Sequence, residues 1–257
     1  MSEIRAVRTA LEIPLSLCYS TIETTKRGGH LLEISKRTKI ISAILKCVVI
    51  VAATVGTYLS YTSGMGGFMS GSTIFKYFTI QSNIAIALLS AVGFVMLLRK
   101  KPAPNAWYVI HYVGTVSITL TGAVFTFVLA PTLGGLAWTP HNILTHVVVP
   151  LSAIIDFFLS AVPGNFKRSY VFYVILPPLA YVIYASIGYA AGWEFSKGHN
   201  YPYFFLNWGS PAGAFGFSDK LPFMGCFWWI LLLTILLLLV GYAYLWLIMK
   251  RKKKKLK

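Results

Sequence analysis

The chain has 257 residues, of which 56% are hydrophobic and 12% charged, and its mean hydropathy is +0.68. A soluble domain carries about 25% charged residues, and low hydrophobicity defines a disordered chain, so both classes are excluded. Lys and Arg total 23 against 7 Asp and Glu, a net charge of +16 that would suit a nucleic-acid binder only in a less apolar chain. The composition therefore predicts an integral membrane protein without a nucleic-acid partner.

Six stretches are apolar and long enough to cross a hydrocarbon core of about 30 Å, which takes roughly 20 helical residues. In chain order they cover residues 40–61, 74–98, 107–130, 142–162, 170–191 and 222–249. The alternating segments of about 10 residues that mark a membrane β-barrel do not occur. We therefore predict an all-α, polytopic membrane protein with a bundle of six transmembrane helices at 40–249.

The positively charged residues predict an orientation for this bundle. Twenty of the 23 Lys and Arg lie before the first stretch, at Lys46 just inside it, in the second and fourth connections, or after the last stretch. By the positive-inside rule both termini are then cytoplasmic. We expect a basic cytoplasmic arm at 1–39 and a polybasic cytoplasmic tail at 250–257, both in contact with anionic membrane lipids. The membrane would be a plasma membrane or endoplasmic reticulum.

The long outer connection at 192–221 is rich in aromatic residues and glycine. This composition favours a lid that folds back over the bundle, and an aromatic belt at the membrane surface is the alternative. As a lid, the connection would use Tyr201, Pro202, Tyr203 and Asn207 to shape a substrate pocket.

Two polar side chains lie at the same expected depth, because Thr79 and His146 each sit about one turn below the outer surface. Ser82 and Asn83 share a helix face with Thr79, and Asn142 shares the face of His146. A hydroxyl, an imidazole and a carboxamide at one depth match the needs of nucleophilic acyl transfer, which takes a nucleophile, a base and an oxyanion donor. The alternative is that these groups only form hydrogen bonds between helices.

A second set of polar residues lies deeper in the membrane. Asp156 is about 15 Å below His146 and near the depth of His111. A buried carboxylate needs a partner, so a structural His111–Asp156 pair is one interpretation and proton transfer by Asp156 is another. His141 and His146 point about 140° apart on a helix, and no third ligand is evident, so we expect no metal site and no cofactor.

Three motifs in chain order resemble the androgen-induced gene 1 family of membrane threonine hydrolases, and resemble its prokaryotic six-span relatives of unassigned function more closely. They are Lys76-Tyr-Phe-Thr79-Ile-Gln-Ser-Asn83, Asn142-Ile-Leu-Thr-His146-Val-Val-Val-Pro150 and Tyr201-Pro-Tyr-Phe-Phe-Leu-Asn207. The eukaryotic members cleave fatty acid esters of hydroxy fatty acids, using a Thr in the second span and a His in the fourth. The resemblance thus implies an ester hydrolase with Thr79 as nucleophile and His146 as base.

Our first hypothesis is an intramembrane lipid esterase in which Asn83 or Asn142 stabilises the oxyanion, Ser82 supports the site, and the partner is a lipid or amphiphilic small molecule. A second hypothesis is a membrane protein that binds or transports a small amphiphile without chemistry, with Asp156 as the proton-coupling group. A third is a structural membrane protein whose polar residues only lock the helices together.

Overall fold

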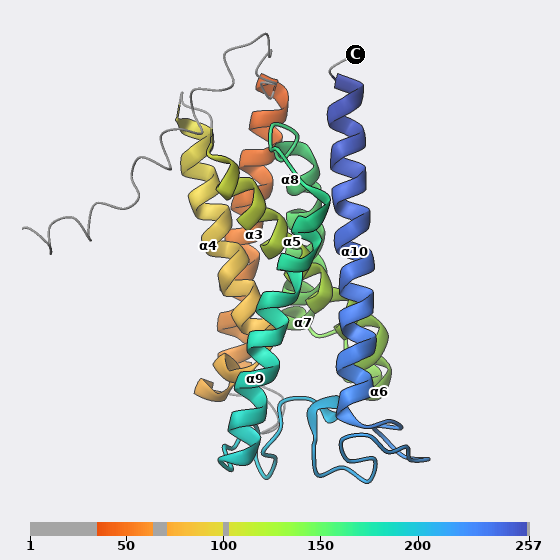
Figure 1. Ribbon diagram of the computed structural model, residues 1–257. Coiled ribbons are helices and arrows are strands. Elements are labelled where there is room, and N and C mark those ends of the chain that lie inside the picture. Colours follow the sequence, from red (N-terminus) through yellow and green to blue (C-terminus); the bar gives the residue numbers. More distant parts are fainter. Residues whose placement is uncertain (1–34, 64–70, 100–102, 256–257) are drawn as a thin grey trace, which may run out of the picture. The chain divides into compact units, whose positions relative to one another are not determined.

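The computed structural model describes residues 35–63, 71–99 and 103–255. The described residues form an all-α bundle with six helices long and apolar enough to cross a membrane, which confirms the predicted fold class (Figure 1). The expected basic arm at 1–39 lies outside the described residues except for its last five, and so do the final two residues of the tail.

Several of the six membrane-length segments are composites of different helix types. The first is α3 (Lys36–Ser63), and the second is α4 (Phe78–Leu98), which follows the 3-10 helix η2 (Gly71–Lys76). The third joins α5 (Asn105–Val124), the π-helical η3 (Phe125–Leu129), α6 (Ala130–Leu133) and the 3-10 turn η4 (Gly134–Leu136). The fourth joins α7 (Pro140–Ile143), the π-helical η5 (Leu144–Val148) and α8 (Val149–Ser160). The fifth joins the 3-10 helix η6 (Arg168–Ile175) and α9 (Leu176–Ala190). The outer connection contains the 3-10 turn η7 (Phe204–Leu206), and the sixth segment is the single helix α10 (Cys226–Lys255).

The centre of the bundle is a four-helix core. Helix α3 packs on α4 and α8, and α5 packs on the same two helices. One buried side chain from each helix, Val49, Ile86, Ile118 and Val149, meets in a shared apolar cluster. Helix α10 stands at the edge of this bundle in Figure 1, and only 17% of its membrane-length window is buried against 50% for the third segment. Most of the surface of α10 is therefore left for lipid.

A buried ion pair joins α3 to α8. The sequence analysis counts Lys46, just inside the first stretch, with the cytoplasmic charges, but in the structure its side chain is 3% exposed and its ammonium contacts the Asp156 carboxylate, which is 1% exposed. Ser42 also donates to Asp156, and His111 Nε2 lies 3.6 Å from the carboxylate. The structure thus brings His111 and Asp156 together, as one interpretation expects, but the full counter-charge comes from Lys46.

A glycine makes room for the lysine. A Cβ added at Gly93 of α4 would lie 3.0 Å from Lys46 Cε and 3.0 Å from the Trp107 ring. Trp107 in turn stacks on His111, with ring centroids 5.8 Å apart. The Lys46 side chain therefore lies against α4 at Gly93, and the Asp156 carboxylate of α8 neutralises its ammonium.

We expect Lys46→Met or Asp156→Leu alone to lower the free energy of unfolding by about 3–5 kcal/mol, because each leaves an uncompensated charge in the bundle. The double variant should recover most of that loss, since two apolar side chains replace a complete pair. Unfolding by sodium dodecyl sulfate in mixed micelles, followed by tryptophan fluorescence, measures the free energy of unfolding of the single and double variants. The matched control is Lys254→Met, which removes an exposed lysine and should change little. A double variant as unstable as the sum of the singles would contradict this role of the pair.

Candidate active site

A helix break places Thr79 at the start of α4. The sequence predicts an unbroken helix here, but Tyr77 is extended, with φ −94° and ψ 139°, and α4 begins at the next residue. Tyr77 is fully buried and packs edge-on against the rings of Phe195 and Tyr203, which holds the break in place. Thr79 therefore lies in the first turn of α4, where backbone N–H groups have no partner within the helix.

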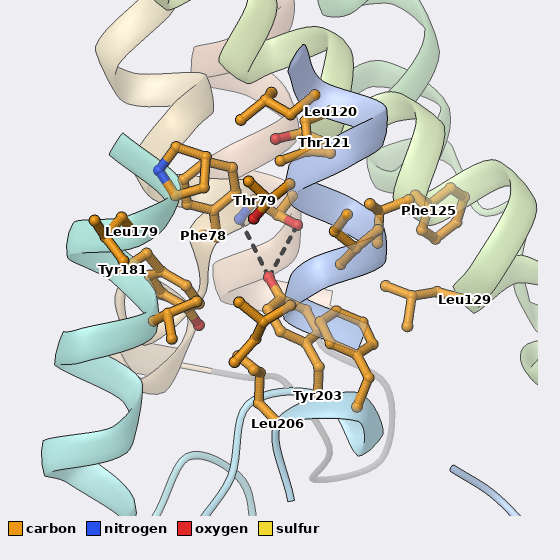
Figure 2. A pocket seen from close by; sticks show the side chains of 18 of the residues that line it. Phe78, Thr79, Leu120, Thr121, Phe125, Leu129, Leu179, Tyr181, Tyr203 and Leu206 are labelled. Atoms are coloured by element: carbon orange, nitrogen blue, oxygen red, sulfur yellow. Dashed lines mark hydrogen bonds between the residues drawn. The ribbon is translucent and has the colours of Figure 1, made fainter. Parts of the chain in front are cut away.

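The phenol of Tyr203 reaches this helix start from the outer connection. The Thr79 N–H donates to Tyr203 Oη at 3.3 Å, and the hydroxyls of the two residues are 3.4 Å apart (dashed lines in Figure 2). Tyr203 thus supplies the cap that the side chain of Tyr77 does not. Burial raises the pKa of Tyr203 above its usual value of about 10, because desolvation disfavours the phenolate. The phenol therefore keeps its proton and is available as a hydrogen-bond donor.

His146 lies in the π-helical segment η5 and not in a regular α-helix as predicted. Its ring stacks on Phe125 of η3, with centroids 3.8 Å apart and ring planes 8° from parallel. His146 is 7% exposed, and among the described residues its Nδ1 atom has no hydrogen-bond partner. An unsatisfied buried polar atom costs about 1–3 kcal/mol, so this nitrogen marks a functional candidate.

The two π-helical segments share a sequence cause. Each ends two residues before a proline, Pro131 after η3 and Pro150 after η5. In η5 the Val149 N–H donates to Leu144 O, five residues back. The next carbonyl, that of Thr145, would then need an N–H from Pro150, which has none. The proline thus leaves one carbonyl open inside the membrane, beside the candidate base.

Asn83 of α4 satisfies that carbonyl. Its Nδ2 donates to Thr145 O at 3.2 Å and to Thr79 O at 2.8 Å. Both amide protons are therefore committed to backbone carbonyls, which joins the helix of the candidate nucleophile to that of the candidate base. Ser82 makes a different link, since its Oγ lies 2.7 Å from Thr121 Oγ1 of α5.

Two cavities meet at Thr79. The polar cavity, of about 350 Å³, is lined by residues of α4, the fourth segment and the outer connection, among them Thr79, His141, Asn142, Thr145, His146, His199, Tyr201, Pro202 and Tyr203. The apolar cavity, of about 100 Å³, lies between α4, α5, α9 and α10, with Phe78, Leu120, Leu179 and Leu206 in its wall (Figure 2). Thr79, Tyr203, Phe125 and Leu129 line both cavities.

The other predicted site residues take separate positions. Asn142 lines the polar cavity, and its Nδ2 donates to Ala137 O at 2.9 Å. Asn207 does not line either cavity; its Oδ1 accepts from the Gly209 N–H within the outer connection. The described part of the chain contains no group of three His, Cys, Asp or Glu residues that could hold a metal ion. The ring of Phe125, which positions the imidazole, was missed from the sequence because nothing in an apolar span marks which phenylalanine faces a histidine.

Comparison of the chain with protein-family models, with curated proteins and with solved structures finds no match. Fold and composition define a multi-pass helical membrane protein.

Close glycine contacts hold η5 against its neighbours, so we expect Gly122→Ala to displace His146. The added Cβ would lie 2.9 Å from His146 O and 3.2 Å from the Pro150 ring, neither of which gives way easily. Such overpacking typically costs about 1–3 kcal/mol. Imidazole NMR shifts of His146 and unfolding in micelles measure the two effects.

The control is Gly135→Ala, where an added Cβ has no neighbour within 4 Å. Equal effects of the two substitutions on stability and on the His146 signal would contradict the proposed clamp on η5.

Proposed function

We propose that the protein is an intramembrane ester hydrolase acting on lipid esters, with Thr79 as the nucleophile and His146 as the base. The observation that carries the proposal is the position of the Thr79 hydroxyl, between a cavity with histidine and asparagine side chains and a cavity walled by apolar ones. An ester with a long acyl chain would place the chain segment next to its carbonyl in the apolar cavity, with the carbonyl beside Thr79. The polar cavity would hold the leaving alcohol and admit water.

The proposed reaction has two halves. Thr79 Oγ1 attacks the ester carbonyl while His146 takes the hydroxyl proton, and the bond to the alcohol then breaks as His146 returns that proton to the leaving oxygen. Water next attacks the acyl-threonine, again giving its proton to His146. Release of the carboxylic acid restores the Thr79 hydroxyl with the proton from His146.

Donors for the oxyanion are close to the proposed nucleophile. The neutral phenol of Tyr203 already contacts the Thr79 hydroxyl, and the Thr79 N–H donates to the same phenol oxygen. Asn142 has a second amide proton beyond the one donated to Ala137 O. We assign the oxyanion role to Tyr203 and Asn142 and not to Asn83, because both amide protons of Asn83 bind carbonyls. In this scheme a substrate carbonyl takes over the hydrogen bonds that now join Tyr203 to Thr79.

The resemblance of the three motifs to the androgen-induced gene 1 family suggests fatty acid esters of hydroxy fatty acids as the first substrates to test. Such esters branch at the scissile bond, and two cavities that meet at one hydroxyl suit a branched molecule. A lateral groove between α4, α5 and the fifth segment, of about 660 Å³, offers such lipids an approach from the bilayer. Phe78 lines both this groove and the apolar cavity.

One observation favours a second candidate, an amphiphile-binding protein without chemistry. The Thr79 hydroxyl contacts Tyr203, and His146 Nδ1 has no partner among the described residues, so the resting site has no preformed bond from Thr79 to Nδ1. Proton-coupled transport through Asp156 finds less support, because Lys46 already neutralises that carboxylate.

We expect the purified protein to hydrolyse branched fatty acid esters in detergent or nanodiscs, and Thr79→Ala to lower this rate to the uncatalysed background. His146→Gln should reduce kcat by about 10²–10⁴-fold, because general base catalysis contributes that much. Thr79→Ser keeps the hydroxyl and should retain measurable turnover. Release of hydroxy fatty acid, followed by mass spectrometry, measures all three rates.

The matched control is Thr132→Ala, since Thr132 lines the polar cavity and its hydroxyl donates to Leu129 O. Full activity in Thr79→Ala would remove Thr79 from the mechanism. Ligand binding without turnover in the unmodified protein would establish the second candidate instead.

A further inference from the structure

A basic groove lies at the opposite end of the bundle from the candidate active site. It forms a cavity of about 190 Å³ between the start of η6 and the last turns of α10, which we call the basic groove, lined by Arg168, Tyr242, Leu245, Trp246, Met249, Lys250 and Lys253. This is the end that the positive-inside rule assigns to the cytoplasm. The inference drawn from it does not depend on the proposed function.

The groove gathers three positive charges without a described counter-ion. Arg168, Lys250 and Lys253 are all exposed, and the Lys250 ammonium lies 4.7 Å from the centre of the Trp246 ring. The described residues include three carboxylates: Asp156 is paired with Lys46, and Glu194 and Asp219 belong to the outer connection at the other end. The groove therefore presents a positive potential to any anion at the membrane surface.

Two neighbouring basic residues of α10 bind backbone carbonyl groups. Arg251 Nη1 donates to Phe158 O at 2.9 Å, and Lys252 Nζ donates to Gly164 O at 3.0 Å. The first bond ties the end of α10 to the last turn of α8, and the second ties it to the connection between α8 and η6. The anchored helix end holds Lys250 and Lys253, one helical turn apart, beside Arg168.

The wall of the groove that faces the bilayer is apolar and aromatic. Tyr242 and Trp246 are 48% and 51% exposed, and Leu239, one turn further into the membrane, is 63% exposed. Amphipathic aromatic rings of this kind favour the headgroup level of a membrane. A ligand that matches both features carries negative charge at one end and hydrocarbon at the other.

We propose that the basic groove binds one anionic glycerophospholipid. Its phosphate would lie among Arg168, Lys250 and Lys253, with the forked guanidinium of Arg168 contacting two phosphate oxygens. Its acyl chains would run along the exposed face of α10 past Trp246 and Tyr242. A soluble phosphate compound would satisfy the charges but would leave the apolar wall unused.

The test uses the full-length protein in phosphatidylcholine nanodiscs that contain a minor fraction of phosphatidylglycerol. Native mass spectrometry counts phosphatidylglycerol retained on the protein, and competition with phosphatidylcholine gives relative affinity. We expect the triple variant R168Q/K250Q/K253Q to bind phosphatidylglycerol roughly 100-fold more weakly, because each of the three basic residues near a membrane surface contributes about a factor of five. The charge-preserving variant K250R/K253R should retain the lipid, which separates lost charge from misfolding.

The matched control is K36Q/R37Q/K39Q, which removes three exposed positive charges from the start of α3 at the same end of the bundle. It should retain phosphatidylglycerol. Equal losses in the two triple variants would show that only general surface charge attracts the lipid and would overturn the proposal. Displacement of the lipid by millimolar inorganic phosphate or glycerol 3-phosphate would overturn it as well, in favour of a soluble ligand.

Discussion

Hydrocarbon offers no hydrogen-bond partners, so every polar group inside the membrane must be satisfied by the chain itself. This constraint explains most of the polar contacts between the helices. Lys46 and Asp156 neutralise each other between α3 and α8, and Ser82 and Thr121 pair between α4 and α5. Asn83 donates to a carbonyl that a proline leaves open. Polar pairs between different spans therefore fix how the helices pack against one another. Removing one member of a pair leaves the other unsatisfied inside the membrane.

The candidate site combines a buried polar atom that departs from this rule with an irregular backbone. His146 is buried, stacked on Phe125, and carries a nitrogen without a partner among the described residues. Around it the backbone is irregular in three places: a break before α4 and two π-helical turns. π-Helical turns are frequent at functional sites, and an unsatisfied nitrogen persists only where the surrounding packing holds it. In the proposed reaction this imidazole takes the proton of the Thr79 hydroxyl.

Hydropathy and charge were sufficient to predict six spans, because the length of an apolar stretch is fixed by the thickness of the membrane. Counting residues from the outer surface also predicted the same membrane depth for Thr79 and His146, and in the structure both residues line one cavity. Lys46 was misplaced because charge counting does not show whether a lysine near a helix end turns inward. The irregular turn before Pro150 was not predicted, and the carbonyl that it leaves open binds Asn83, which comes from another helix. The Tyr203 contact depends on how a long connection folds, which local patterns do not determine.

The central claim is that Thr79 forms a covalent bond to an acyl group, and trapping that intermediate tests it most directly. The protein is mixed with an activated fatty acyl ester, quenched in acid within a turnover, digested, and mapped by mass spectrometry. We expect one acyl group on the peptide that contains Thr79, accumulating when deacylation is slow and absent in Thr79→Ala. Rapid ester turnover without any acylated peptide, or an acyl group on a different residue, would contradict it.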